Sequence, residues 1–315
     1  MKFNNQNEDI LALLNRGIKY DLDRMLKAAD LLNRPHAQYK TIHVAGTNGK
    51  GSTCSYIESV LRIAGFKTGM FTSPYINSPI EQFQVNGKII SEEDIINLNE
   101  DLINIINDLE LSFFEASALI AFEIFCRESV DYAIIETGMG GIHDATNIIV
   151  PEVSVITRLA MDHCEFLGDS LLKVSEQKLG IVKASIPLIM IEPEQPEIKI
   201  LAEKKCKEMG SEIIFVKNND ETDGVSFTWK DMLFTPGMKG RHQKENALLA
   251  LNVLDKIGSF SYDDLYNGIN SSSLPGRFQM VSFKSKNIIL DAAHNPDAIS
   301  VLCKALEEEF PLKKK

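Results

Sequence analysis

The feature that most constrains this chain is the stretch TIHVAGTNGKGST at residues 41–53. It places an apolar, β-branched run before three glycines, one lysine and two hydroxyl residues. The run 41–45 predicts a strand, and residues 50–64 have the pattern of a helix. A bare turn between them lets backbone N–H groups approach phosphate oxygens, while the helix N-terminus and the lysine supply positive charge. We expect a phosphate-binding loop, with a purely structural glycine-rich turn as the alternative.

The stretch departs twice from the strict P-loop pattern, GxxxxGK followed by Ser or Thr. Gly51 stands directly after Lys50, where a hydroxyl residue is expected, and Val44 occupies the position of the first glycine. The strand, the lysine, two hydroxyl residues and the helix are nevertheless all present. We therefore predict nucleotide binding through eight consecutive residues: Gly46, Thr47, Asn48, Gly49, Lys50, Gly51, Ser52 and Thr53.

The rest of the chain alternates predicted strands and helices. An Asn86-Gly87 turn predicts a hairpin over 82–90. Further strands are expected at 67–71, 131–136, 153–157, 186–191, 213–216, 278–283 and 287–291, and a second hairpin at 225–234. Helices are expected at 21–32, 91–108, 114–127, 193–209, 241–256, 261–269 and 297–310, with Lys178 also on a helix. This order predicts an α/β fold with a mostly parallel sheet flanked by helices.

A breaker-rich segment near residue 275 predicts a domain boundary. We expect an ATP-binding domain over residues 1–275 and a second unit over 276–315. The second unit has only 40 residues, well below the ~100–150 typical of a domain. The sequence alone leaves two interpretations: the chain is cut short, or this segment packs on the first domain.

Composition excludes several classes of protein. The 315 residues carry a net charge of 33 − 44 = −11, which argues against a nucleic-acid or anionic-membrane binder. No apolar run is long enough to span a bilayer, the first residues are polar, and five scattered cysteines form no CxxC pair. We expect a cytoplasmic protein with reduced thiols, and a monomer by default.

Several motifs extend the evidence of the glycine-rich turn. The heptad GTNGKGS (46–52) resembles the signature of the folylpolyglutamate synthase group of the Mur ligase superfamily. Further matches follow in family order: TSPY at 72–75, FFE at 113–115, ETGMGG at 136–141, DATN at 144–147, MDH at 161–163, QKLGI at 177–181, HQ at 242–243, NA at 246–247, PGRF at 275–278 and DAAHNP at 291–296. The resemblance runs from about residue 17 to 310, nearly the whole chain.

This resemblance implies a Mur ligase-like P-loop domain, followed by a C-terminal α/β domain that is incomplete here. It implies an ATP- and Mg²⁺-dependent ligase that adds L-glutamate to the γ-carboxylate of a reduced folate through an acyl phosphate. A bifunctional dihydrofolate synthase/folylpolyglutamate synthase is the alternative within the family. A truncated, non-catalytic nucleotide-binding relative is the alternative from another class, and it predicts impaired ligation. A bare P-loop ATPase would explain none of the later motifs.

The resemblance also implies roles for individual residues. Lys50, Lys178 and His163 would be catalytic, and Lys178 would be carbamylated. The remaining nucleotide contacts would come from Asn246, Arg277, Asp291 and His294. Mg²⁺ would be held by Ser73, Glu136 and His163, and folate by Ser73, Pro74, Tyr75 and Glu115.

The residues themselves support these roles unequally. Glu136 ends a buried strand, where open α/β sheets bind ligands, although it could merely cap the next loop. A lone helical lysine such as Lys178 is usually solvated, and a lone His163 is more often structural. Arg277 suits phosphate because it is planar and always charged, but a linker salt bridge is the alternative.

The sequence departs from the family pattern at five positions. Ile80 and Gln82 stand where arginines often stand, and Ile142-His143 replaces an Arg-Leu pair. Ala292 replaces a glycine in the last motif. We therefore expect the contacts to pterin or glutamate to differ from those of other family members.

Overall fold

The computed structural model describes residues 16–17, 21–96, 100–217 and 225–310. Its centre is an eight-stranded sheet in the order β4-β3-β2-β5-β1-β6-β7-β8. Strands β2, β5, β1, β6, β7 and β8 run parallel, and β3 and β4 extend one edge as an antiparallel hairpin. That hairpin turns at Asn86-Gly87, both with positive φ, as the sequence predicts.

The described part contains the following elements. The strands are β1 Lys40–Ala45, β2 Thr68–Phe71, β3 Phe83–Val85, β4 Lys88–Ile89, β5 Tyr132–Glu136, β6 Val153–Ile156, β7 Leu188–Ile191, β8 Ile213–Val216, β9 Phe227–Trp229, β10 Met232–Phe234, β11 Gln279–Phe283 and β12 Lys286–Leu290. The helices are α2 Asp23–Leu31, α3 Lys50–Ile63, α4 Glu92–Ile96, α5 Glu100–Asp108, α6 Phe113–Arg127, α7 Cys164–Leu167, α8 Leu171–Lys178, α9 Pro196–Met209, α10 His242–Ile257, α11 Tyr262–Ser271 and α12 Pro296–Glu309.

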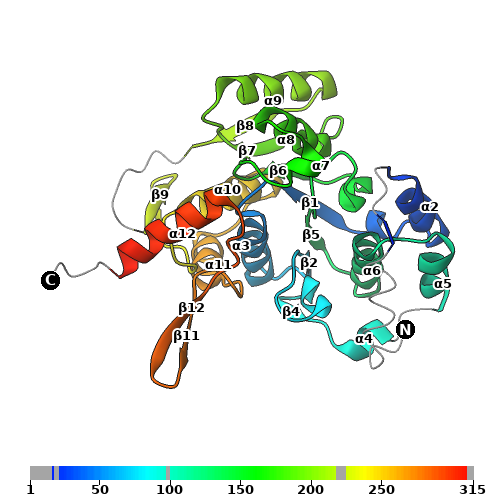
Figure 1. The fold of residues 1–315 in the computed structure, drawn as a ribbon, viewed down its shortest axis with the longest axis horizontal. Helices are drawn as coiled ribbons and strands as arrows, with labels where there is room; N and C mark the ends of the chain where they lie inside the picture. Colours follow the sequence, from blue (N-terminus) through cyan, green and yellow to red (C-terminus); the bar gives the residue numbers. More distant parts are fainter. Residues whose placement is uncertain (1–15, 18–20, 97–99, 218–224, 311–315) are drawn as a thin grey trace.

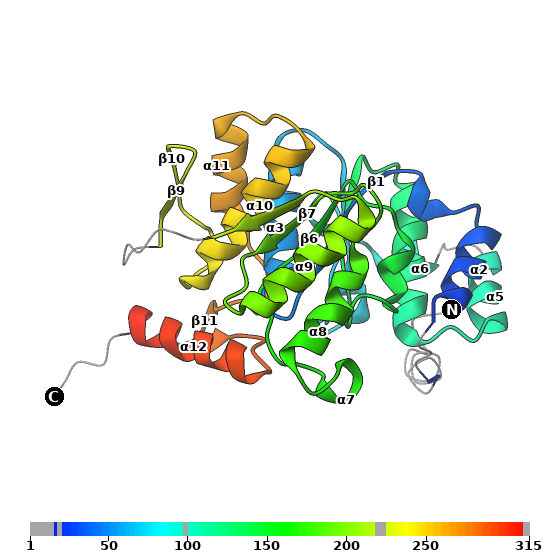
Figure 2. The same cartoon turned by 90° about the horizontal axis from the view of Figure 1, so that it is seen from above.

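Helices cover both faces of the sheet, which explains why its strands are apolar on both sides (Figure 1). Ile42 and Val44 of β1 pack with α3, α10 and α11 in one core. On the other face, Ile135 of β5 packs with α6, and Met190 of β7 packs with α9. Figure 2 shows these layers from above, with α3 and α10 on the side opposite α9. The predicted α/β class with a mostly parallel sheet is confirmed.

The register brings the ends of four parallel strands to one edge. Val44 pairs with Glu136 and Ala45 with Ile156, while Phe71 pairs with Ile135. The loops that follow β1, β2, β5 and β6 therefore leave the sheet side by side. This shared edge is where open α/β sheets bind ligands.

The segment after residue 275 forms a separate two-stranded antiparallel sheet, β11–β12, followed by α12. Figures 1 and 2 show α12 lying beside the sheet edge, with the hairpin projecting away from the body. The Asn295 amide at the start of α12 donates to Asn48 Oδ1 at 3.0 Å. The structure shows that this segment packs on the first part of the chain.

One predicted element differs from the structure. The continuous helix expected over residues 91–108 is described as two helices, α4 and α5, and residues 97–99 between them lie outside the described part. The other predicted strands and helices begin within three residues of the observed ones. Among the described helices, none combines the length and the apolar character needed to cross a bilayer.

Helix α3, which begins at the glycine-rich turn, is held from behind by α11. A Cβ built on Gly268 of α11 would lie 2.4 Å from Val60 Cγ2 and 2.6 Å from Val60 Cα. The two helix backbones therefore approach more closely than any larger residue at position 268 allows.

We predict that Gly268→Ala lowers the free energy of unfolding by about 1–3 kcal/mol through overpacking. Helix propensity alone would favour alanine by up to ~1 kcal/mol, so the sign of the change tests the packing. Urea denaturation of both proteins measures it. The exposed neighbour Asn267 gives the control Asn267→Ala, which should stay within about 0.5 kcal/mol of wild type. A stabilised Gly268→Ala protein would contradict the close approach.

Candidate functional site

The glycine-rich turn between β1 and α3 requires glycine at two positions. Gly46 has a φ of 143°, and a Cβ there would lie 1.9 Å from Thr157 Oγ1. Gly49 has a φ of 89°, and a Cβ there would lie 2.3 Å from Asn246 Oδ1. Any other residue would meet both backbone strain and a steric clash.

The first half of the turn is fixed to the loop after β6. The amides of Thr47 and Asn48 donate to the carbonyl of Arg158 at 2.9 and 3.3 Å. The Thr47 hydroxyl donates to the Ala160 carbonyl at 2.9 Å. The loop after β6 therefore holds the first half of the turn in place through backbone carbonyls.

The departure at Gly51 has a steric reason. A Cβ there would lie 3.1 Å from Leu274 Cδ2 and 3.3 Å from Glu136 Oε2, both tighter than ordinary van der Waals contact. A serine or threonine after Lys50 would press against the Glu136 carboxylate. The glycine lets this carboxylate approach the turn.

The centre of the site is an ion pair between Lys50 and Glu136. Lys50 Nζ lies 3.7 Å from Glu136 Oε1 and donates to the Thr47 carbonyl at 3.2 Å. Glu136 is only 2% exposed, and its Oε2 accepts the Ser73 amide at 3.2 Å. Burial raises the pKa of Glu136, while the charges of Lys50 and Arg277 oppose that rise.

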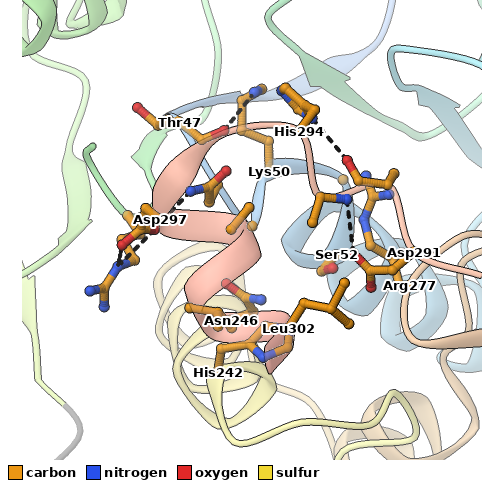
Figure 3. Close-up of a pocket in the computed structure, with 18 of the residues that line it drawn as sticks. Thr47, Lys50, Ser52, His242, Asn246, Arg277, Asp291, His294, Asp297 and Leu302 are labelled. Carbon is orange, nitrogen blue, oxygen red and sulfur yellow. Dashed lines mark hydrogen bonds and ion pairs between the residues drawn. The ribbon is translucent and has the colours of Figure 1, made fainter. Parts of the chain in front are cut away.

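The opposite side of the site comes from α10, the linker and the β12–α12 loop (Figure 3). Asn246 donates to Gln243 Oε1 at 3.0 Å, and Gln243 donates to Ser52 Oγ at 3.3 Å. Asp291 accepts the amides of Phe278 and Ala293 at 2.8 and 2.9 Å. These contacts orient the side chains that face the turn.

One pocket gathers most of the predicted nucleotide-binding residues. Its lining includes Thr47, Asn48, Gly49, Lys50, Gly51, Ser52, Asn246, Arg277, Asp291 and His294. Gly46 and Thr53 flank this set in the chain but do not line the pocket. His294 Nδ1 lies 2.8 Å from the Ala292 carbonyl.

A second, longer groove meets the first pocket. Ser73, Pro74 and Tyr75 line the groove, as do Glu81 and Ile89. The two compartments share Gly51, Ser73, Pro74, Glu136, Arg277, Asp291 and Ala292. A ligand in the groove would therefore meet a ligand in the pocket at Glu136.

Lys178 is not solvated. It is 3% exposed, and its Nζ donates to the Gly46 carbonyl at 2.8 Å, directly behind the turn. Burial lowers the pKa of Lys178 to about 7, and the charge of Lys50 adds to that effect. A lysine with such a pKa is largely neutral just above neutrality, as attack on CO₂ requires.

Besides Gly46, Thr53 and Lys178, two more predicted residues, His163 and Glu115, line neither compartment. The side chain of His163 is 44% exposed, with Nε2 3.7 Å from Asp162 Oδ2. Glu115 pairs with Arg24 at 2.5 Å and accepts the Ser112 amide at 2.9 Å, forming the capping box of α6. Because its carboxylate is engaged by these partners, the structure does not bring Glu115 to the groove.

The donors near Lys50 suit a hard cation. Mg²⁺ prefers oxygen ligands and needs only one or two carboxylates, because it retains several waters. Glu136, and Ser73 bonded to it, supply such oxygens beside the turn. In the described part, no cluster of three or more His, Cys, Asp or Glu side chains is arranged to hold a metal ion.

Several residues that line the pocket were not predicted from the sequence, among them the charged residues Arg158, Glu245 and Asp297. Arg158 follows β6 and Asp297 lies in the first turn of α12, and both line the pocket. The rule that ligands meet the carboxyl ends of parallel strands could have indicated Arg158. Nothing in the local sequence pairs it with Asp297, 139 positions away.

Comparison with known proteins gives the family. The family model of the Mur ligase middle domain matches residues 44–254. The chain is 33% identical over 307 residues to a probable dihydrofolate synthetase of Schizosaccharomyces pombe, covering 93% of this chain and 73% of that protein. It is 32% identical over 323 residues to a dihydrofolate synthase/folylpolyglutamate synthase of Bacillus subtilis, covering 94% and 74%.

The chain belongs to the folylpolyglutamate synthase/dihydrofolate synthase family of Mur ligases. A solved structure described as an FPGS-AMPPCP-folate complex matches it with a TM-score of 0.90 and 27% identity, over 99% of this chain and 81% of that one. The resemblance read from the sequence motifs is confirmed. This Mur ligase chain spans about three quarters of the length of the two curated relatives.

The buried lysine of this Mur ligase generates a pH prediction. The pKa of Lys178 is lowered from 10.5 to about 7 on folding. The unfolded chain therefore binds more protons between these values, and the cost of burying Lys178 decreases as the pH rises from 7 to 10.5. We expect the stability of Lys178→Met relative to wild type to fall over that range, in CO₂-free buffer. Chemical denaturation at several pH values measures it, and a pH-independent difference would contradict the lowered pKa.

Proposed function

We propose that this chain is an ATP-dependent ligase that adds L-glutamate to the γ-carboxylate of a reduced folate. The observation that carries the proposal is the junction of the two compartments at Glu136, 3.7 Å from Lys50. A triphosphate on the glycine-rich turn and a carboxylate in the groove can meet there. The curated names of its relatives and the nucleotide analogue and folate in the matching complex support both ligands.

The reaction divides into two transfers. The folate carboxylate attacks the γ-phosphorus of ATP, the bond to the β–γ bridging oxygen breaks, and ADP leaves. The glutamate amine then attacks the acyl phosphate carbonyl, loses a proton and expels phosphate. Negative charge builds on phosphoryl oxygens in both transfers, so groups already in place beside them accelerate the reaction.

The residues of the pocket have distinct tasks in this proposal. Backbone amides at the start of α3 and the Lys50 ammonium bind the phosphates. Arg277, which lies between pocket and groove, neutralises charge at the reacting carboxylate or phosphate. Asn246, Asp291 and His294 orient the nucleotide from the opposite side.

Mg²⁺ fits beside these groups. Glu136 and Ser73 would hold it, and the ion would supply charge neutralisation at the phosphate oxygens. His163 was also predicted as a metal ligand and catalytic residue. His163 is exposed and lies outside the pocket, so the structure supports it as a metal ligand less than it supports Glu136 and Ser73.

Lys178 is proposed to be carbamylated, as in relatives of the Mur ligase superfamily. Its neutral amine would attack the carbon of CO₂, forming an N–C bond as one C=O π bond breaks toward oxygen. Loss of a proton from nitrogen would leave an anionic carbamate. Burial favours the neutral amine that this step needs. The modified side chain would lie behind the turn, where Lys178 contacts Gly46.

The groove is proposed to hold the folate. Ser73, Pro74 and Tyr75 line it, whereas Glu115 acts through α6 as a capping residue. Among the residues that replace family arginines, Gln82 is buried and its side-chain amide donates to the Pro79 carbonyl. It supports the loop and does not line the groove.

A bifunctional enzyme that also joins dihydropteroate to glutamate is the second candidate. The Bacillus subtilis relative carries both activities in its name. Incubation with ATP, labelled glutamate and either acceptor separates the candidates by product. Nucleotide binding with no product from either acceptor would favour the non-catalytic alternative.

The remaining proposals concern organisation. We propose a boundary near residue 275, with residues 1–275 as the ATP-binding domain and 276–315 as part of a second domain. We also propose a cytoplasmic location, since all five cysteines are free thiols. A monomer is the proposed default for the oligomeric state. Sedimentation of the purified chain tests the oligomeric state.

We predict that Lys50→Ala lowers the rate of folate-dependent ADP formation by about 10²–10³-fold, because a preorganised cation beside the phosphates is lost. A coupled ADP assay measures the rate. Lys67→Ala is the matched control, since Lys67 pairs with Glu128 on the surface and lines neither compartment. Equal rates for Lys50→Ala and wild type would refute the proposed role of the turn.

A further inference from the structure

A carboxylate from the last helix lies against the phosphate-binding turn. Asp297, in the first turn of α12, accepts the Asn48 side-chain amide on Oδ2 at 2.8 Å. Arg158 Nε lies 3.3 Å from the same oxygen and 3.4 Å from Oδ1. An amide and a guanidinium therefore hold one anionic group at the edge of the pocket (Figure 3).

The two groups that hold Asp297 belong to the nucleotide pocket. Asn48 and Arg158 line it beside Lys50, and Asp297 lines it from the other side. The Arg158 carbonyl accepts the amides of Thr47 and Asn48, so its backbone is part of the turn's support. Its guanidinium contacts the same carboxylate, Asp297, as the side-chain amide of Asn48 in the turn.

Arg158 is a cation in a largely acidic setting. A second carboxylate, Glu245 of α10, lies 3.8 Å from Arg158 Nη1. Burial raises the pKa of Glu245, and Arg158 opposes that rise. The side chain of Arg158 is 41% exposed, so it has room to change partners. Phosphate and carboxylate accept the same fork of guanidinium donors.

We propose that Arg158 is a further nucleotide-binding residue, and that Asp297 competes with the nucleotide's phosphates for Arg158 and Asn48. The inference rests on the proposed binding of ATP at the turn. A phosphate chain carries more negative charge than one carboxylate, so it displaces Asp297 when it binds. The displacement also removes one link between α12 and the turn, leaving the Asn48–Asn295 pair.

The competition predicts changes of opposite sign at the two residues. Asp297→Asn keeps the size of the side chain and can still accept a hydrogen bond, but it removes the competing charge. It should lower the Kd of Mg-ATP by about two- to fivefold, the range of a partly exposed charge pair. Arg158→Gln should raise the Kd by a similar factor. If Asp297 only tied α12 to the turn, Asp297→Asn would weaken binding or leave it unchanged.

The test is isothermal titration of the whole chain with Mg-ATP. In the Arg158→Gln background, Asp297→Asn should increase the affinity for Mg-ATP less than it does in the wild-type background, because the two residues share one interaction. Glu308→Gln is the matched control. Glu308 ties the same helix to Arg241 at 2.9 Å, lies outside the nucleotide pocket, and should leave the Kd unchanged.

The outcomes separate the inference from the proposed function. If wild type binds no Mg-ATP, the proposed function fails and the inference fails with it. If wild type binds but Asp297→Asn binds no more tightly, only the inference is overturned. Thermal denaturation of each variant accompanies the titrations. If Asp297→Asn unfolds, Asp297→Ser takes its place, and the same increase in affinity for Mg-ATP is required of it.

Discussion

The pair formed by Lys50 and the buried Glu136 is the interaction on which the rest of the site depends. Burial raises the pKa of the Glu136 carboxylate, and the charge of Lys50 opposes that rise. Their separation of 3.7 Å lets each support the charge of the other. The pairing requires Val44 and Glu136 to lie opposite each other on β1 and β5, and it requires a glycine at position 51. The register of β1 and β5 and the glycine in the turn are therefore both needed to bring Lys50 and Glu136 together.

Much of this arrangement could be predicted from local patterns. Apolar runs at 41–45 and 131–136 predicted two strands of a mostly parallel sheet, and the position of Glu136 at a strand end indicated a ligand site. The motif resemblance misassigned no element, yet it did not reveal the partners of Glu115. The spacing from Ser112 to Glu115 is itself a capping signature, and that local interaction takes up the carboxylate. The pairing of Arg158 with Asp297 could not be predicted, because it joins distant segments whose approach is set by the packing of α12.

The two compartments explain why a chain of this fold can join a carboxylate to an amine. One compartment presents backbone amides and a cation, which suit phosphate; the other is lined by Ser73, Pro74, Tyr75 and apolar side chains such as Ile89. Their common wall contains Glu136 and Arg277, one anionic and one cationic group. Ligands bound in the two compartments can therefore meet at this wall, and the helices packed behind α3 keep it in place.

The attachment of the turn to the loop after β6 has a consequence for how its amides are allocated. The N–H groups of Thr47 and Asn48 donate to the Arg158 carbonyl, and the Thr53 N–H makes the first helical hydrogen bond, to the Gly49 carbonyl. The amides in between, at residues 49–52, belong to the helix end that has no acceptor of its own. In the glycine-rich segment, residues 47–48 are therefore anchored to the neighbouring loop, and the amides of residues 49–52 remain available to an anion. An anion bound there lies near the axis of α3 and not beside the neighbouring strand.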